Sequence, residues 1–305
     1  MGRRVDTAVQ EAMQGRWGAV LFESVQRQEK RCMYTCTVAQ GGSVQVQVFL
    51  SSPSPDPTQI QAFMAVSHPG LLTIYDYFPV TVESEQCAGL VQEHYSKTLH
   101  RELQDRARNR YPWKEAEMWR YMRELVDVMG FMQWQERSHA SLSPHSLYIT
   151  WDKQVKVGDW VQEMSELSQK EYYPVSVSNI YKADVYALGR ILLNMCQLEW
   201  NTSSVDISRQ ISLLQYSASI KTLLSRMLET EESSRCDFVD LYCGLNPGLE
   251  LLGIRKAEEE EALDVAEEML EGNIHTNLAY TIRRSYGVAS GGKKSEIAER
   301  NSVCS

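Results

Sequence analysis

The stretch that decides the fold is S-H-A-S-L-S-P-H-S-L-Y-I, residues 138–149. Its frame is H-x-x-L-x-P, and three positions within and just after that frame hold serine: Ser141, Ser143 and Ser146. A serine hydroxyl is too weak a base to take a proton from a substrate, and it binds Mg²⁺ less well than a carboxylate or an amide. These three positions of the loop therefore hold no group suited to acid–base or metal chemistry.

The composition predicts a globular protein that does not bind nucleic acid. The chain has 305 residues, of which 43% are hydrophobic, and this suits one large bilobal domain or two ordinary ones. The formal net charge is −9 and the pI is near 5.3. Nucleic-acid binding depends on clustered lysine and arginine, so an acidic, solvated surface is the simpler interpretation.

The cysteines are odd in number and scattered, with no C-x-x-C pair and no histidine at zinc-ligand spacing. This pattern predicts reduced packing residues in preference to disulfides or zinc ligands. The seven are Cys32, Cys36, Cys87, Cys196, Cys236, Cys243 and Cys304.

Membrane signals are missing from the sequence. No apolar run reaches the roughly 18 residues that a bilayer-spanning helix needs. Residues 1–6 lack a hydrophobic signal core, Asp6 stands where myristoylation needs Ser or Thr, and Cys304 is misplaced for prenylation. We therefore expect a cytoplasmic protein with no membrane partner.

The first part of the chain is rich in strands. Residues 4–14 can form a short amphipathic helix, and a loop at 51–57 precedes a helix from about 58 to 66. A Gly41-Gly42 turn before an alternating run predicts a hairpin. Alternation and β-branched or aromatic residues predict strands at 17–22, 33–38, 43–50, 71–78 and 88–93.

After Tyr95 the pattern changes to helices. Residues 112–136 carry methionines and leucine at helical spacing, which predicts one buried face, and such a stripe is more often core than a cofactor site. Further helices are predicted at 182–196 and 220–228. The fold class is therefore α+β, with a small β-rich part followed by a larger helical part.

Several segments resemble the protein kinase fold in their order and spacing, over roughly residues 18–245. The most specific is K-A-D-V-Y-A-L-G at 182–189, which resembles the kinase pattern k-a-D-v-w-S-l-G. The loop at 138–149 resembles the kinase catalytic loop H-R-D-L-x-x-x-N. The other similar segments are His68–Phe78, Gly89–His94, Lys156–Val161, and Leu223–Leu228 with Arg235.

The resemblance implies a bilobal fold. A small antiparallel sheet with one regulatory helix would form the N-lobe, at residues 18–94, and helices would form the C-lobe, at 95–248. A helical extension at 1–17 would precede them, and an acidic helical extension with a flexible end would follow at 249–305.

The resemblance also implies that the catalytic groups are replaced. In kinases a lysine holds the nucleotide phosphates and pairs with a glutamate, an aspartate accepts the substrate proton, and an asparagine holds Mg²⁺. The two amides at the Lys and Glu positions could still hydrogen-bond to each other. The replaced positions, including that of the lysine two residues after the catalytic aspartate, are Gln47, Gln59, Ser141, Ser143 and Ser146.

The glycine-rich loop that covers the phosphates in kinases is missing as well. Residues 23–32 fall at its place and contain no glycine, so side chains would obstruct the phosphates. Lys30 or Arg31 could replace the missing lysine, although a solvated hairpin tip is the simpler interpretation.

The purine site is expected to be filled. Gln45 stands where kinases have a small alanine above the adenine, and Tyr148 stands in place of the leucine beneath it. Asp159, in D-W-V where kinases have D-F-G, is the one retained catalytic-type residue. Alone it cannot fix magnesium and nucleotide, so we expect no cofactor, with weak binding of ATP and Mg²⁺ left as an alternative.

The positions that pack the kinase core keep suitable residues in this sequence, whereas the positions that carry out kinase chemistry do not. Asp184 is the residue expected to hold the catalytic-loop backbone, and His139 is interpreted as a core histidine. Arg235 would lack its usual glutamate partner unless Glu171 supplies one, and Pro174-Val175 is the nearest substitute for the missing A-P-E motif. The kinase core column would consist of Phe63, Ile74, His139 and Trp160.

The acidic segment 257–270 predicts a helix with Leu263, Ala266 and Leu270 on one stripe. It could pack on its own domain with its charges solvated, or it could bind a protein partner. Residues 285–305 suggest a flexible end by composition.

Together these observations predict a catalytically inactive kinase homologue, a pseudokinase that acts through protein contacts as a scaffold, allosteric regulator or structural subunit. One alternative is an enzyme with residual or unconventional ATP-dependent kinase or nucleotidyl transferase activity that uses Asp159. Another is a purely architectural component of a large complex.

Overall fold

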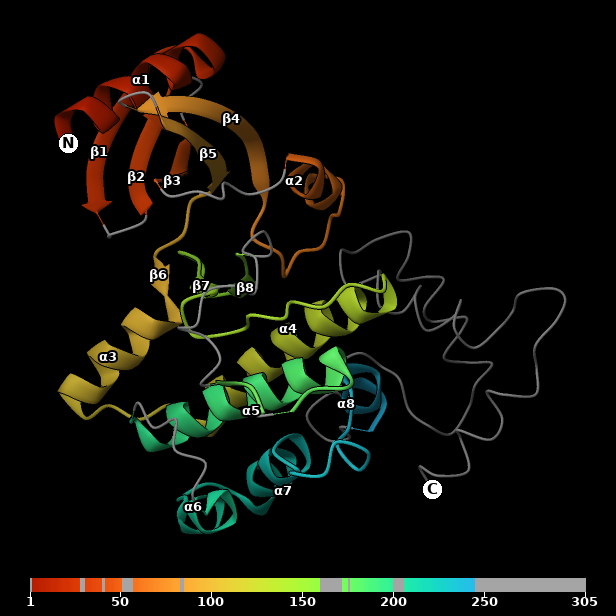
Figure 1. Ribbon diagram of the computed structural model, residues 1–305. Helices are drawn as coiled ribbons and strands as arrows, with labels where there is room; N and C mark the ends of the chain where they lie inside the picture. Colours follow the sequence, from red (N-terminus) through yellow and green to blue (C-terminus); the bar gives the residue numbers. More distant parts are fainter. Residues whose placement is uncertain are drawn as a thin grey trace, which may run out of the picture. The chain divides into compact units, whose positions relative to one another are not determined.

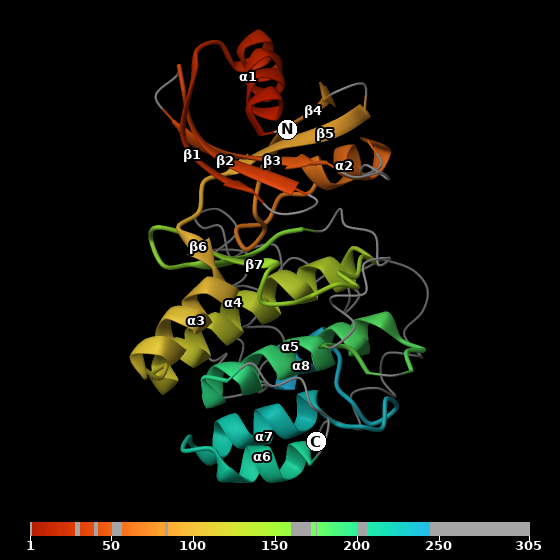
Figure 2. The ribbon, with the colours of Figure 1, turned by 60° about the vertical axis from the view of Figure 1, so that its left-hand side comes forward.

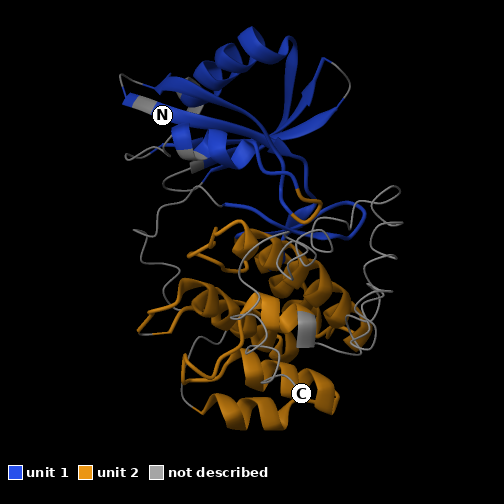
Figure 3. Cartoon of the chain, turned by 90° about the vertical axis from the view of Figure 1, so that its right-hand side faces the viewer, with its two compact units in different colours: residues 1–67, 71–99, 146–166 blue, residues 68–70, 100–145, 167–305 orange. Residues whose placement is uncertain are grey.

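The computed structural model divides the chain into two compact units (Figure 3). Unit 1 comprises residues 1–67, 71–99 and 146–166, and unit 2 comprises 68–70, 100–145 and 167–305. The structure describes residues 2–27, 31–39, 42–50, 57–82, 85–159, 172–174, 176–199 and 206–244.

Unit 1 is built on a five-stranded antiparallel sheet in the order β1-β2-β3-β5-β4 (Figure 1). A small three-stranded sheet, β6-β7-β8, belongs to the same unit. Its elements are α1 Gly2–Trp17, β1 Val20–Arg27, β2 Arg31–Val38, β3 Ser43–Phe49, α2 Pro57–Met64, β4 Ile74–Val82, β5 Glu85–Glu93, β6 Lys97–Thr98, β7 Leu147–Ile149 and β8 Val155–Val157.

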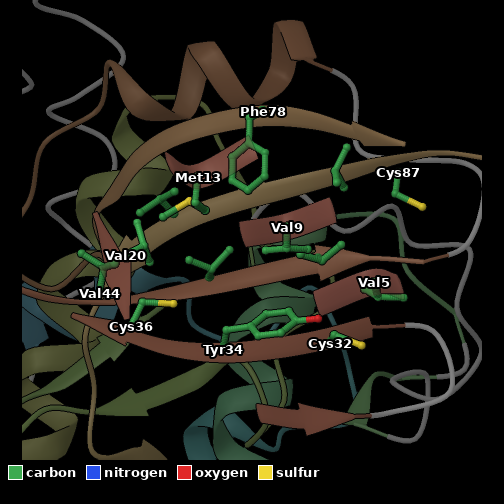
Figure 4. Packing of buried hydrophobic residues seen from close by; sticks show 14 of the residues in the cluster. Val5, Val9, Met13, Val20, Cys32, Tyr34, Cys36, Val44, Phe78 and Cys87 are labelled. Carbon is green, nitrogen blue, oxygen red and sulfur yellow. The ribbon is translucent and has the colours of Figure 1, made fainter. Parts of the chain in front are cut away.

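Helix α1 covers one face of the large sheet (Figure 4). Val5, Val9 and Met13 recur every four residues, so they share one face of the helix, and each is at most 1% exposed. They pack into one cluster with sheet residues that include Tyr34 and Phe78. Polar contacts hold both ends of α1: the Tyr34 hydroxyl donates to Asp6 at 2.9 Å, and Trp17 Nε1 donates to Asp76 at 3.1 Å.

Helix α2 packs in a second hydrophobic cluster of unit 1. Ile60 of α2 and Leu90 of β5 form its buried centre, with Phe63 and Ile74 packed against them. Strand β3 alternates between Val44, Val46 and Val48, which belong to the α1 cluster, and the glutamines between them. Because side chains alternate along a strand, these glutamines point away from α1. Figure 1 and Figure 2 show α1 along one face of the sheet.

Unit 2 is mainly helical. Helices α4 and α5 form its buried interior, and α8 packs on α4 while α7 packs on α5. Its helices are α3 Leu99–Asn109, which begins at the junction of the units, α4 Glu115–Trp134, α5 Ile180–Gln197, α6 Ile207–Leu213, α7 Ala218–Met227 and α8 Phe238–Gly244.

The predicted α+β class is confirmed, because a five-stranded antiparallel sheet precedes a mainly helical region, consistent with a bilobal kinase-like arrangement. The predicted domain boundaries stay a prediction. Within the described ranges, no helix combines the length and the apolar character needed to cross a membrane.

Candidate functional site

The two glutamines predicted at the nucleotide site lie on β3. Gln45 is opposite Thr35 of β2, and its Nε2 donates to the Thr35 hydroxyl at 3.2 Å. Gln47, two residues on, is 1% exposed, and neither of its amide atoms has a hydrogen-bond partner among the described residues. The backbone of Gln59 lies in α2, but its side chain is outside the described part, so the predicted amide pair stays a prediction.

Gln92 is a further buried amide on this face, and it was not among the predicted site residues. It is paired with Gln45 across β3 and β5, it is 3% exposed, and its Nε2 is unpaired within the described part of the chain. The alternation of β5 could have indicated it, because Gln92 follows the buried Leu90 at a spacing of two.

Tyr148 lies in a packed aromatic cluster of unit 1. Its ring centroid is 4.5 Å from that of Tyr95, and Leu72 and Met33 complete the cluster. Met33 is the cross-strand neighbour of Gln47, so the cluster adjoins the glutamine face of the sheet. A Cβ atom added to Gly158 would meet the Tyr148 ring at 2.7 Å, which shows how closely the ring fills this space.

Asp159 follows Gly158 in the sequence, and Gly158 lies against the Tyr148 ring. Asp159 is half-buried and has a left-handed backbone with φ 58°, an uncommon conformation for a residue with a side chain. The preceding Gly158 N–H donates to the Ser146 carbonyl at 2.9 Å, and Ser146 is fully buried. Within the described residues, no group of three or more histidine, cysteine or acidic side chains could hold a metal ion.

In unit 2, Asp184 holds the loop backbone, as the sequence predicts. Its Oδ2 accepts from the His139 N–H at 2.8 Å, and its Oδ1 accepts from the Ala140 N–H at 2.9 Å. Ala140 has φ 61°, so these bonds fix a left-handed turn. Burial raises the pKa of Asp184 to about 6, and its hydrogen bonds only partly offset that rise.

Tyr173, which was not among the predicted site residues, completes this arrangement. Its hydroxyl donates to Asp184 Oδ1 at 2.6 Å and accepts from the Leu142 N–H at 2.7 Å. Burial, followed by the nearby Asp184, raises the pKa of Tyr173 well above 10. The tyrosine therefore stays protonated and links the loop to α5.

The loop serines of unit 2 are buried. Ser141 is 6% exposed, and its Oγ lies 3.3 Å from His139 Nδ1, which also accepts from the Ser141 N–H at 3.3 Å. Ser143 is 1% exposed. His139 is 4% exposed, which agrees with its interpretation as a core histidine.

Arg235 is held by carbonyl groups. Its guanidinium donates to the carbonyls of Glu229 at 2.7 Å, Lys182 at 3.3 Å and Thr230 at 3.3 Å, and it lies 4.8 Å from the Tyr186 ring centroid. Arg235 is therefore satisfied without a carboxylate from the described part of the chain.

Some predicted features lie outside the described residues: Lys30, Trp160, Glu171, Val175 and the segment 257–270. The side chain of Arg31 is also not described. Phe63 and Ile74 share one cluster of unit 1, whereas His139 belongs to unit 2, so the column as a whole stays a prediction.

Comparison with known proteins supports the kinase resemblance at a distant level. A TBC domain-containing protein kinase-like protein of Dictyostelium discoideum is 24% identical over 148 residues. This chain thus has a kinase-like homologue. The match covers 42% of this chain and 14% of that protein, so the chain matches only a small part of its relative. No family model matches the chain.

Proposed function

We propose that the chain is a catalytically inactive kinase-like protein, a pseudokinase, that acts through contacts with other proteins. The observation that carries this proposal is the uncharged, buried amide of Gln47, which by the sequence resemblance corresponds to the phosphate-binding lysine of kinases. A primary amide supplies no positive charge for the phosphates of ATP.

The packing around Tyr148 supports the same proposal. Tyr95, Leu72 and Met33 pack around the Tyr148 ring. By the sequence resemblance, Tyr148 corresponds to the leucine that lies beneath the adenine in kinases. A purine could enter only if these side chains moved, and moving packed side chains costs contact energy that nucleotide binding would have to offset.

Thermal denaturation of the full chain with and without ATP and Mg²⁺ tests the proposal. A ligand of the native state at 100 times its Kd would add about 2.7 kcal/mol of stability. We expect no shift of the melting temperature at millimolar ATP. A clear rise would overturn the proposal, and if the variant Asp159→Asn abolished that rise, an ATP-dependent activity that uses Asp159 would be favoured.

A further inference from the structure

Three cations lie at the C-terminal end of α3 and in the turn that leads to α4. Arg108 at the end of α3, and Arg110 and Lys114 in the turn, are exposed, together with Tyr111, which is 53% exposed. We call these four residues the basic tip. Among the described residues, no carboxylate forms an ion pair with the three cations.

Neighbouring carboxylates are already engaged. Arg106 is half-buried next to the basic tip, and its guanidinium forms ion pairs with Glu102 at 2.6 Å and with Glu117 at 3.0 Å. Asp105 pairs with Arg101 at 3.2 Å. These carboxylates therefore do not neutralise the positive charge of the basic tip.

The turn itself is ordered, so the cations are presented on a fixed support. The Arg106 guanidinium lies 4.4 Å from the Trp113 ring centroid and 5.2 Å from that of Tyr111. The Tyr111 N–H also donates to the Arg106 carbonyl at 2.9 Å. A binding surface built on such a support loses little conformational entropy when it is occupied.

The same chain contains a segment of opposite charge. Residues 257–270 include seven acidic residues and no lysine or arginine. The three leucine and alanine positions expected on one stripe of this segment would suit the exposed ring of Tyr111, and its glutamates would suit the surrounding cations.

The connecting chain is long enough to join the two. Helix α8 contacts the C-terminal end of α4, where the Phe238 N–H donates to Gln133 at 3.1 Å, and the basic tip precedes the N-terminal end of α4. The 20 residues of α4 span roughly 30 Å. The twelve residues 245–256 reach up to about 40 Å when extended.

We propose that the acidic segment 257–270 docks on the basic tip of its own chain. This contact would cover Tyr111 and neutralise the three cations. A partner that binds either surface would first have to displace the other, so the contact would regulate access to both.

Zero-length carbodiimide cross-linking of the full chain tests this proposal, because the reagent joins a carboxylate to an amine in direct contact. We expect mass spectrometry to find Lys114 joined to glutamates of 257–270. In a mixture of isotope-labelled and unlabelled chains, these cross-links should join peptides of the same isotope only. Mixed-isotope cross-links would assign the basic tip to a second copy and overturn the proposal.

A charge-reversal pair provides the matched comparison. The double variant Arg108→Glu and Arg110→Glu keeps the Lys114 amine, and we expect its cross-link yield to fall at least tenfold. Arg209→Glu with Arg226→Glu, at exposed sites elsewhere in unit 2, should change the yield less than twofold. Equal yields in both variants, or no Lys114 cross-link in the unaltered chain, would overturn the proposal. Circular dichroism of both variants checks that these exposed changes leave the fold intact.

Discussion

Gln47 places a primary amide inside unit 1 without a hydrogen-bond partner among the described residues. A buried polar group left unsatisfied costs about 1–3 kcal/mol. The substitution Gln47→Met keeps the length of the side chain and removes both polar atoms. We therefore expect urea denaturation to show a free energy of unfolding about 1–3 kcal/mol higher than that of the unaltered chain.

Gln45→Met is the matched control, because Gln45 lies on the same face of β3 but bonds to Thr35. This substitution should leave the free energy of unfolding unchanged or lower it. Equal gains at both positions would contradict the explanation by an unsatisfied amide.

Asp184 gives the chain a defined dependence of stability on pH. Its pKa in the folded chain is about 6, against 3.8 for an ordinary aspartate. The folded state therefore binds more protons between these pH values. The contribution of Asp184 is fully present below the unfolded pKa and is lost as the pH rises through about 6.

The variant Asp184→Asn removes this titration. We expect the stability of the unaltered chain relative to the variant to fall by about 2.4 kcal/mol between pH 4 and pH 7. Urea denaturation at several pH values measures the difference. A relative stability that rises with pH would show that the hydrogen bonds from His139, Ala140 and Tyr173 outweigh burial.

At the scale of the elements, α1 shields one face of the large sheet, because Val5, Val9 and Met13 pack in one buried cluster with sheet residues. Met13 is fully buried between α1 and the sheet, whereas Met64 of α2 is 38% exposed. Met13→Ala should lower the free energy of unfolding by about 2–5 kcal/mol, and Met64→Ala should lower it much less because its side chain is partly solvated.

Thiol labelling gives an independent measurement of the same packing. Burial raises the pKa of Cys36, in the α1 cluster, to about 12, so its thiol should react slowly. Labelling should become faster in Met13→Ala and stay slow in Met64→Ala. Slow labelling in both variants would argue that α1 is not needed to shield the sheet.

The elements differ in how far their sequences predict them. The alternating run at 43–50 and the apolar stripe at 112–136 predict β3 and α4 to within three residues. Helix α3 was not predicted, because most of its residues are polar or charged; its apolar residues do recur at helical spacing, but only Leu99 and Leu103 are buried. Strands β7 and β8 have three residues each, too few for a period to show.

The residues of the candidate site also differ in how far the sequence predicts them. Motif spacing placed Asp184 beneath the loop backbone, because both lie in segments with strong patterns. Tyr173 lies in a segment without a pattern, so nothing in the sequence indicated that its hydroxyl bridges Asp184 and Leu142. Hydrogen-bond partners set by tertiary packing leave no periodic trace.

At the scale of the whole molecule, the proposed loss of catalysis is spread over both units. Gln47 and Tyr148 belong to unit 1, whereas Ser141 belongs to unit 2. The triple variant Gln47→Lys, Ser141→Asp and Ser146→Asn restores the charged and amide groups but keeps the packed ring of Tyr148. We expect it to show no rise in melting temperature with ATP and Mg²⁺.

Adding Tyr148→Leu to this variant tests the part played by the ring. If nucleotide stabilises the fourfold variant and not the triple one, the packed cluster is the dominant obstacle. Stabilisation of the triple variant would show instead that the ring does not block the site.

Because the chain is synthesised from its N-terminus, the Tyr148 cluster can be completed only after the large sheet has been made. Helix α1 and strands β1 to β5 lie within the first 93 residues, so the ribosome releases the large sheet before either long helix. Tyr148 emerges only after α3 and α4. Until then Met33, Leu72 and Tyr95 lack their central ring, and the growing chain presents that apolar surface to chaperones.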